Sequence, residues 1–122
     1  AFPEAQMDAL VALSRSILTR HPIPARNVVG HSDVAPLRKQ DPGELFDWKR
    51  LADAGVGLWV DGAAPAVADD YELAAMLAAY GYAIGDEFTS VAAFQRHFRP
   101  AKVDGVADAQ TAGILKALLE RA

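Results

Sequence analysis

The sequence has 122 residues, a net charge of −4 and 52% hydrophobic residues. This length suits one ordinary domain or two small ones, and the apolar content excludes a globally disordered chain. No long basic stripe is present, so we expect no nucleic-acid partner. No apolar run reaches the roughly 18 to 20 residues of a membrane helix. The absence of cysteine excludes disulfides and thiolate metal ligands.

The first predicted element is a helix over residues 2–20, where apolar residues recur at helical spacing. The sequence HPIP at 21–24 ends this helix, because proline cannot continue the hydrogen-bond ladder. Val28 and Val29 then predict a very short strand. A loop over residues 31–46 and a short helix over residues 46–54 follow.

The second half begins after a change in composition at residues 61–70, where small residues, a proline and acids are typical of a linker. Three helical patterns follow, over residues 71–80, 90–98 and 108–121. Asp108 is a suitable N-cap for the last of them. This half is predicted to form a three-helix unit.

The first half presents a physical problem. One long helix, one short strand and one short helix cannot make a domain core, since a lone strand leaves both of its edges unpaired. We therefore expect residues 1–62 to be the C-terminal part of a larger, mixed α/β domain. Residues 63–69 are expected to be a linker, and residues 70–122 a small all-α three-helix module.

Three residues of the predicted loop point to metal chemistry. His31 and Asp41 offer imidazole nitrogen and carboxylate oxygen, which are ordinary zinc ligands, and the proline-stiffened loop between them can fold back. Lys39 lies two residues before Asp41, where a cation would stabilise the oxyanion formed when a carbonyl is attacked. The spacing alone also fits a structural histidine, a turn organised by Asp41 and a solvated lysine.

A longer motif surrounds these residues. The sequence GHSDVAPLRKQDPGELFDW, Gly30 to Trp48, resembles the C-terminal zinc motif of the type 2 N-acetylmuramoyl-L-alanine amidases, the AmpD and AmiD family. The resemblance implies that His31 and Asp41 bind Zn²⁺ and that Lys39 assists the transition state. It also implies hydrolysis of the amide between N-acetylmuramic acid and L-alanine in peptidoglycan or muropeptides.

A second resemblance covers the other half. The sequence FTSVAAFQRHFRPAKVDGVADAQTAGILKALLE, Phe88 to Glu120, resembles a three-helix peptidoglycan-binding module. Such a module after the zinc motif is typical of the AmiD-like branch of the family. This layout implies a location in the periplasm or cell envelope, with the module keeping the enzyme on the cell-wall polymer.

Two parts of the family's catalytic site lie upstream of the segment that begins here, namely the first zinc histidine and the catalytic glutamate. We do not assign their roles to His21, His97 or Glu44. The chain alone is therefore expected to be inactive, and an N-terminal fragment of the same protein is a candidate partner that completes the site. The alternative hypothesis is a non-catalytic peptidoglycan-binding protein.

Four other residues have candidate roles apart from direct metal binding. Trp48 and Trp59 can stack on sugar rings, but packing is the favoured interpretation. Asp69 is interpreted as an N-cap. Asp33 either bonds to its own loop or supports a metal ligand.

Overall fold

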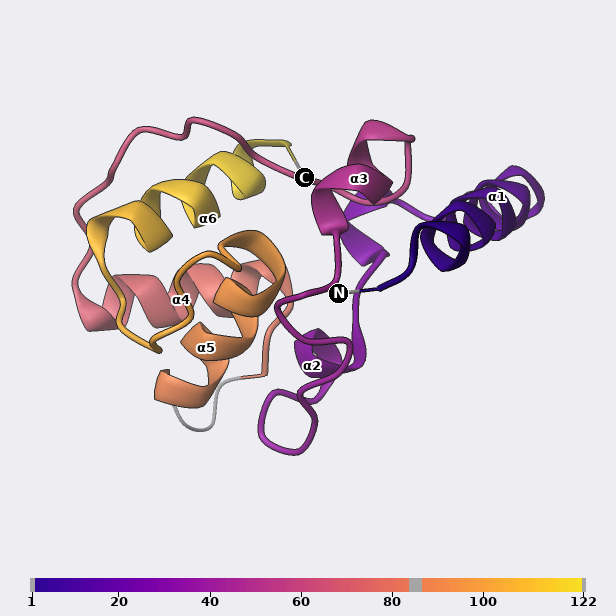
Figure 1. The fold of residues 1–122 in the computed structure, drawn as a ribbon. Coiled ribbons are helices and arrows are strands. Elements are labelled where there is room, and N and C mark those ends of the chain that lie inside the picture. The colour runs from indigo at the N-terminus through magenta and orange to yellow at the C-terminus, as the bar shows by residue number, and fades with distance from the viewer. Residues whose placement is uncertain (1, 84–86, 122) are drawn as a thin grey trace.

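All regular elements that the structure describes are helices. The structure is a computed structural model that describes residues 2–83 and 87–121. The elements in chain order are α1 (Glu4–Arg20), the 3-10 turn η1 (Ala25–Asn27), α2 (His31–Val34), α3 (Trp48–Asp53), α4 (Asp70–Tyr80), α5 (Glu87–Phe98) and α6 (Ala109–Arg121). Figure 1 shows α4, α5 and α6 gathered on one side, while α1 extends away from them on the other.

The predicted α/β fold is wrong for the described residues, which contain no strand. Val28 has extended backbone angles, as does Gly30, the N-cap of α2. Extended backbone becomes a strand only when a neighbouring segment pairs with it, and no other described segment does so here. The predicted loop at residues 31–46 also contains the one-turn helix α2.

Helices α4, α5 and α6 form a three-helix bundle, defined here as residues 70–83 and 87–121, and this confirms three of the predicted helices. Its core includes several fully buried side chains: Leu73, Leu77, Val91, Phe94, Leu115 and Leu118. Two of its helices begin at the predicted kind of residue. The Asp69 carboxylate accepts a hydrogen bond from the Glu72 amide at 2.7 Å, and Asp108 accepts one from the Thr111 amide at 2.9 Å.

The extended segment between α3 and α4 runs along the outside of α6 (Figure 1). The Ala66 amide donates to the carbonyl of Ala109 at 3.0 Å. Gly113 allows this close approach, because a Cβ there would lie 2.1 Å from the carbonyl oxygen of Ala64. The segment predicted as a linker therefore packs on the bundle, while the division into domains at residues 63–69 stays a prediction.

The N-terminal region, defined here as residues 2–62, has a smaller core. Its buried apolar residues are Met7, Trp48, Leu51 and Val56. Arg50 joins α3 to α1 through Glu4, at 2.9 Å, and through Asp8. Among the described residues, no helix has both the length and the apolar character needed to cross a bilayer.

Candidate functional site

His31 and Asp41 lie together at the surface of the N-terminal region. His31 is the first residue of α2, and the chain then turns back through residues 36–38 to reach Asp41. Its Nδ1 atom lies 3.4 Å from Oδ2 of Asp41, and the two side chains are 48% and 65% exposed. The structure thus brings together both predicted metal ligands and leaves them open to solvent.

Backbone hydrogen bonds hold this loop in its folded-back form. The Ser32 amide donates to the carbonyl of Asp41 at 2.8 Å, which ties the start of α2 to the end of the loop. The Ala35 amide donates to the carbonyl of His31 at 2.9 Å, and the Lys39 amide donates to that of Ala35 at 2.9 Å. These bonds fix the path of the chain between the two candidate ligands.

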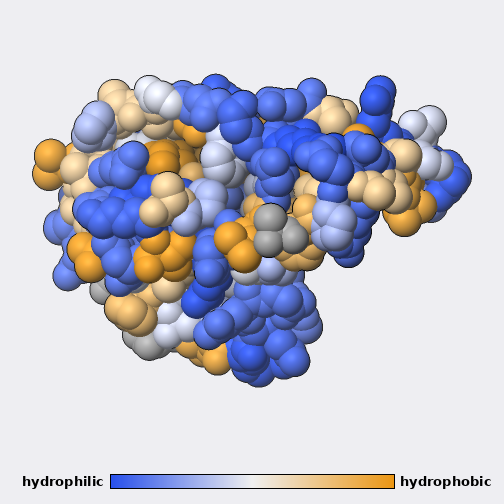
Figure 2. All heavy atoms as spheres, in the orientation of Figure 1, coloured by the Kyte–Doolittle hydropathy of each residue, from blue (hydrophilic) through white to orange (hydrophobic). Residues whose placement is uncertain are grey.

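Lys39 and its neighbour Arg38 form part of the same loop, and both are exposed. In the described part of the chain, neither side chain makes a hydrogen bond or an ion pair. Figure 2 shows the loop that follows α2 in Figure 1 as a hydrophilic lobe. Both cations are therefore available to a ligand, which is the condition that the predicted role of Lys39 requires.

The donor set of the pair fits zinc. Histidine nitrogen and aspartate oxygen both bind zinc at about 2.0–2.2 Å, and two such ligands of a tetrahedral ion lie about 3.3–3.5 Å apart. The observed separation of 3.4 Å matches that spacing. Within residues 2–83 and 87–121, no group of three potential ligands is close enough to hold an ion. His31 and Asp41 thus fit two positions of a zinc site.

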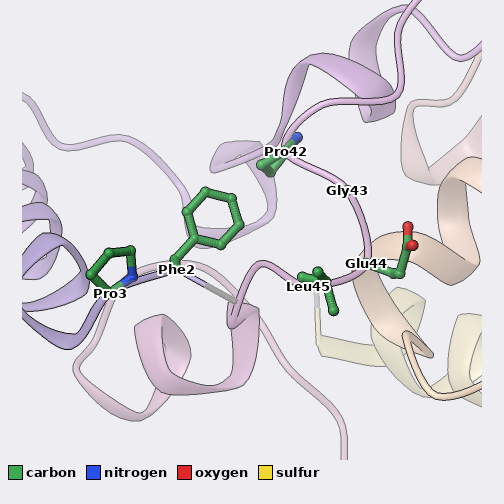
Figure 3. Close-up of a pocket in the computed structure, with 6 residues that line it drawn as sticks. All are labelled: Phe2, Pro3, Pro42, Gly43, Glu44 and Leu45. Atoms are coloured by element: carbon green, nitrogen blue, oxygen red, sulfur yellow. The ribbon is translucent and has the colours of Figure 1, made fainter.

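An open pocket of about 390 Å³ adjoins the loop immediately after Asp41. Figure 3 shows the rings of Phe2 and Pro42 on one side of it and the Glu44 carboxylate on another. The remaining lining residues are Pro3, Gly43 and Leu45. The walls of this pocket are mostly apolar, with one acidic group at the rim.

Asp33 is buried two residues after His31, and its carboxylate has three partners. Oδ2 accepts a hydrogen bond from the Gly30 amide at 2.8 Å and lies 2.7 Å from Nδ1 of His97, while Oδ1 accepts one from the Tyr82 hydroxyl. Burial, the negative charge of Asp33 and this hydrogen bond raise the pKa of Tyr82 well above its usual value, so the hydroxyl remains a donor.

His97 contacts the candidate site through Asp33, and the sequence did not predict this contact. Its ring is buried in the bundle and stacks on the indole of Trp48, with the ring centres 3.8 Å apart. This contact confirms the packing interpretation of Trp48. The signal in the sequence was a histidine among the apolar residues of α5, but nothing in its spacing indicates contact with Asp33, which lies far away in the chain.

The other candidates lie apart from the pair. His21 is exposed at the C-terminal end of α1. Trp59 is half-buried beside the bundle core, and its Nε1 donates to Asp61 at 2.9 Å. The structure brings neither residue to the His31–Asp41 loop.

Comparison with known proteins shows that the chain is similar to N-acetylmuramoyl-L-alanine amidases. Residues 1–44 match the family Amidase_2, described as N-acetylmuramoyl-L-alanine amidase. The chain is 43% identical to the N-acetylmuramoyl-L-alanine amidase AmiD of Escherichia coli K12, over 98% of the chain and 49% of the relative. A shorter match, 49% identical, covers 41% of the chain and 27% of the 1,6-anhydro-N-acetylmuramyl-L-alanine amidase AmpD of Enterobacter cloacae.

Solved structures show the same likeness. AmiD from E. coli, in complex with the substrate anhydro-N-acetylmuramic acid-L-Ala-D-γ-Glu-L-Lys, superposes with a TM-score of 0.90 at 42% identity, over 98% of this chain and 53% of that one. AmpDh3 from Pseudomonas aeruginosa, in complex with anhydromuramic pentapeptide, gives 0.91 at 38% identity, over 98% and 54%. The chain therefore spans about half the length of these relatives. Its first 44 residues match the amidase family Amidase_2, and the chain as a whole is similar to about half of an AmiD-type N-acetylmuramoyl-L-alanine amidase.

Proposed function

We propose that this chain forms part of a zinc amidase that cleaves the bond between N-acetylmuramic acid and L-alanine in peptidoglycan. The observation that carries the proposal is the pairing of His31 Nδ1 with Asp41 Oδ2 at 3.4 Å on an exposed loop. The similarity to AmiD over 98% of the chain supports it. The substrate class follows from the names of these relatives, which are amidases of muramyl compounds.

In this proposal, His31 and Asp41 hold the ion through a deprotonated imidazole nitrogen and a carboxylate oxygen. Held there, the ion would supply Lewis-acid polarisation of the amide carbonyl and activation of the attacking water. The ammonium group of Lys39 stabilises the negative charge that develops on the carbonyl oxygen. The Ser32 amide holds the backbone of Asp41 in place while this occurs.

We place the remaining zinc ligand and the general base in the half of the relatives that this chain does not match. The chain alone is then inactive, and a segment carrying that half, covalently joined or separate, completes the site. The general base takes the proton of the attacking water and passes it to the leaving amine.

The bundle has the proposed role of binding the cell-wall polymer in the periplasm or cell envelope. Binding there raises the effective concentration of the substrate bond without adding contacts at the reacting atoms. Sedimentation of the 122-residue chain with purified sacculi tests this role. We expect the chain to pellet with sacculi and to remain in solution without them, and a chain that stays in solution in both cases would contradict it.

A chimera tests the amidase proposal without requiring any other part of this protein. In the chimera, the chain replaces the part of E. coli AmiD to which it is similar. We expect the chimera to release stem peptide from anhydromuropeptide, and His31→Ala and Asp41→Ala to abolish that activity. Lys39→Ala is expected to lower kcat while zinc remains bound, and Arg38→Ala is the matched control for loss of a neighbouring cation. Full activity of the His31→Ala and Asp41→Ala chimeras would contradict the assignment.

A second candidate is a non-catalytic protein that binds peptidoglycan through the bundle, which has a continuous core of its own around Phe94, Leu115 and Leu118. If the chimera is inactive while the isolated chain still binds sacculi, this second function is the better conclusion.

A further inference from the structure

We propose that the bundle positions the candidate metal loop, and that Asp33 is the residue through which it does so. This inference rests on the proposed function for the identity of the ligands. It adds that the second half of the chain is a structural component of the site as well as a cell-wall anchor. Asp33 is a positioning residue in this account, since it acts on His31 through the backbone.

The first argument is the set of partners around a buried carboxylate. Asp33 is 7% exposed, and a buried carboxylate needs hydrogen-bond donors to offset the loss of water. One donor, the Gly30 amide, comes from the loop, whereas the Tyr82 hydroxyl and His97 Nδ1 come from the bundle. Because a carboxylate only accepts, Nδ1 is the nitrogen of His97 that carries the proton. The bundle thus supplies most of what keeps Asp33 in place.

The second argument is the shortness of α2. This helix has four residues, far fewer than the number that is stable alone in water. Its only buried side chains are those of Ser32 and Asp33, and both reach the bundle. Arg96 of α5 donates to the Ser32 hydroxyl at 3.2 Å. The helix that begins with His31 is therefore held by contacts with α5 and with Tyr82.

The third argument is the route from the bundle to both ligands. Ser32 lies between His31 and Asp33, and its amide donates to the carbonyl of Asp41 at 2.8 Å. A shift of Asp33 moves the backbone at Ser32, and this bond carries the movement to Asp41. The positions of both ligands therefore depend on the position of Asp33.

Packing around His97 holds this partner of Asp33 in place. Its ring lies flat against Trp48, with 13° between the planes, and its Nε2 atom is buried without a partner among the described residues. Gly30 permits close packing on the other side of Asp33, since a Cβ there would lie 2.7 Å from Cδ of Pro42 and 3.2 Å from Cζ2 of Trp48. The two ends of the loop and the bundle therefore meet around Asp33.

The test compares Tyr82→Phe with Tyr80→Phe in the full 122-residue chain. Tyr82→Phe removes the hydroxyl that donates to Asp33 and keeps the ring in the core. Tyr80→Phe is the matched control, because it removes a hydroxyl from a neighbouring buried tyrosine, whereas the hydroxyl that donates to Asp33 is that of Tyr82. Asp33→Asn provides a second variant, which removes the carboxylate while keeping the shape of the side chain.

The first measurement needs no metal. Amide hydrogen exchange reports whether the Ser32–Asp41 bond stays closed. We expect the Ser32 amide to exchange about tenfold faster in Tyr82→Phe and in Asp33→Asn, and about as in the wild type in Tyr80→Phe, with amides of α6 unchanged in all three. Unchanged Ser32 exchange in both Tyr82→Phe and Asp33→Asn would overturn the inference. Equal acceleration across α6 would also overturn it, because it would indicate general destabilisation.

The second measurement separates this inference from the proposed function. Zn²⁺ is titrated into each chain while the side-chain NMR signals of His31 are followed. The loss of a group that orients a ligand typically weakens metal binding by about tenfold or more, and we expect that change in Tyr82→Phe and Asp33→Asn but not in Tyr80→Phe. If the His31 signals of the wild-type chain do not change on addition of Zn²⁺, the proposed function is contradicted. The comparison of hydrogen exchange would still decide whether Asp33 positions the loop.

Discussion

The bundle and the N-terminal region differ in the size of the apolar core that each one buries. In the bundle, Phe94, Leu115 and Leu118 are fully buried in one continuous core. In the N-terminal region, the buried apolar core consists of Met7, Trp48, Leu51 and Val56 alone among the described residues. The bundle therefore has the core of a self-supporting unit, whereas the loop with His31 and Asp41 takes its rigidity from contacts with the bundle.

The largest effect that tests this difference is expected in the bundle core. Leu115→Ala removes a side chain with no exposed surface, and such changes lower the free energy of unfolding by about 2–5 kcal/mol. Leu13→Ala, at a site 57% exposed, is expected to change it by less than about 0.5 kcal/mol. Denaturant unfolding of both variants gives the two values. Similar losses would contradict the assignment of the main core to the bundle.

A smaller loss is expected where the extended segment crosses α6. In Gly113→Ala, the new Cβ would lie 2.1 Å from a backbone oxygen of Ala64, so the segment must move. Overpacking of this kind costs about 1–3 kcal/mol, and the Ala66–Ala109 hydrogen bond should open. Hydrogen exchange at Ala66 and thermal unfolding measure both effects. Lys116→Ala, on the exposed side of α6, is the control, and an equal loss there would contradict the packing of the segment.

The smallest effect concerns pH and the Asp108–Arg99 pair of the bundle. Burial raises the pKa of Asp108, but hydrogen bonds from Arg99 and Thr111 outweigh burial and lower the pKa from 3.8 to about 2. A group with a lowered folded-state pKa stabilises the protein fully above its unfolded pKa, and that stability is lost as the pH falls through the folded value. The window therefore lies between about pH 4 and pH 2.

The Asp108 side chain is 28% exposed, so screening by solvent should limit the contribution of the pair to less than about 1 kcal/mol. Thermal unfolding of the wild type and of Asp108→Asn across that window tests the prediction. The stability difference between the two chains is expected to shrink as the pH falls. A difference that is constant with pH would contradict the lowered pKa of Asp108.

The parts of the fold that follow from local sequence were predictable. Leu73 and Leu77 recur at helical spacing, and Asp69 precedes them as an N-cap, so α4 could be placed from the sequence. The interpretation of Val28 and Val29 as a strand was wrong, because β-branched residues favour extended backbone but cannot supply a pairing partner. The existence of a strand depends on other segments, and the local pattern carries no information about them.

The candidate site also has parts that the sequence predicts and parts that it does not. The motif from Gly30 to Trp48 was enough to select His31, Lys39 and Asp41, and the structure brings His31 and Asp41 to 3.4 Å. The contact of Asp33 with His97 was not predictable, since it joins residues 64 positions apart. A buried polar pair of this kind leaves no periodic pattern in the sequence, and only the packing of α2 against α5 reveals it.

The measurement that tests the central claim most directly is a Zn²⁺ titration of the 122-residue chain, followed by NMR of its three histidine side chains. The account predicts that the signals of His31 shift saturably, that those of His21 and His97 do not, and that Asp41→Asn weakens binding by tenfold or more, about as expected when a ligand is removed. His31 signals that stay unchanged, or binding that is equally strong in Asp41→Asn, would contradict it.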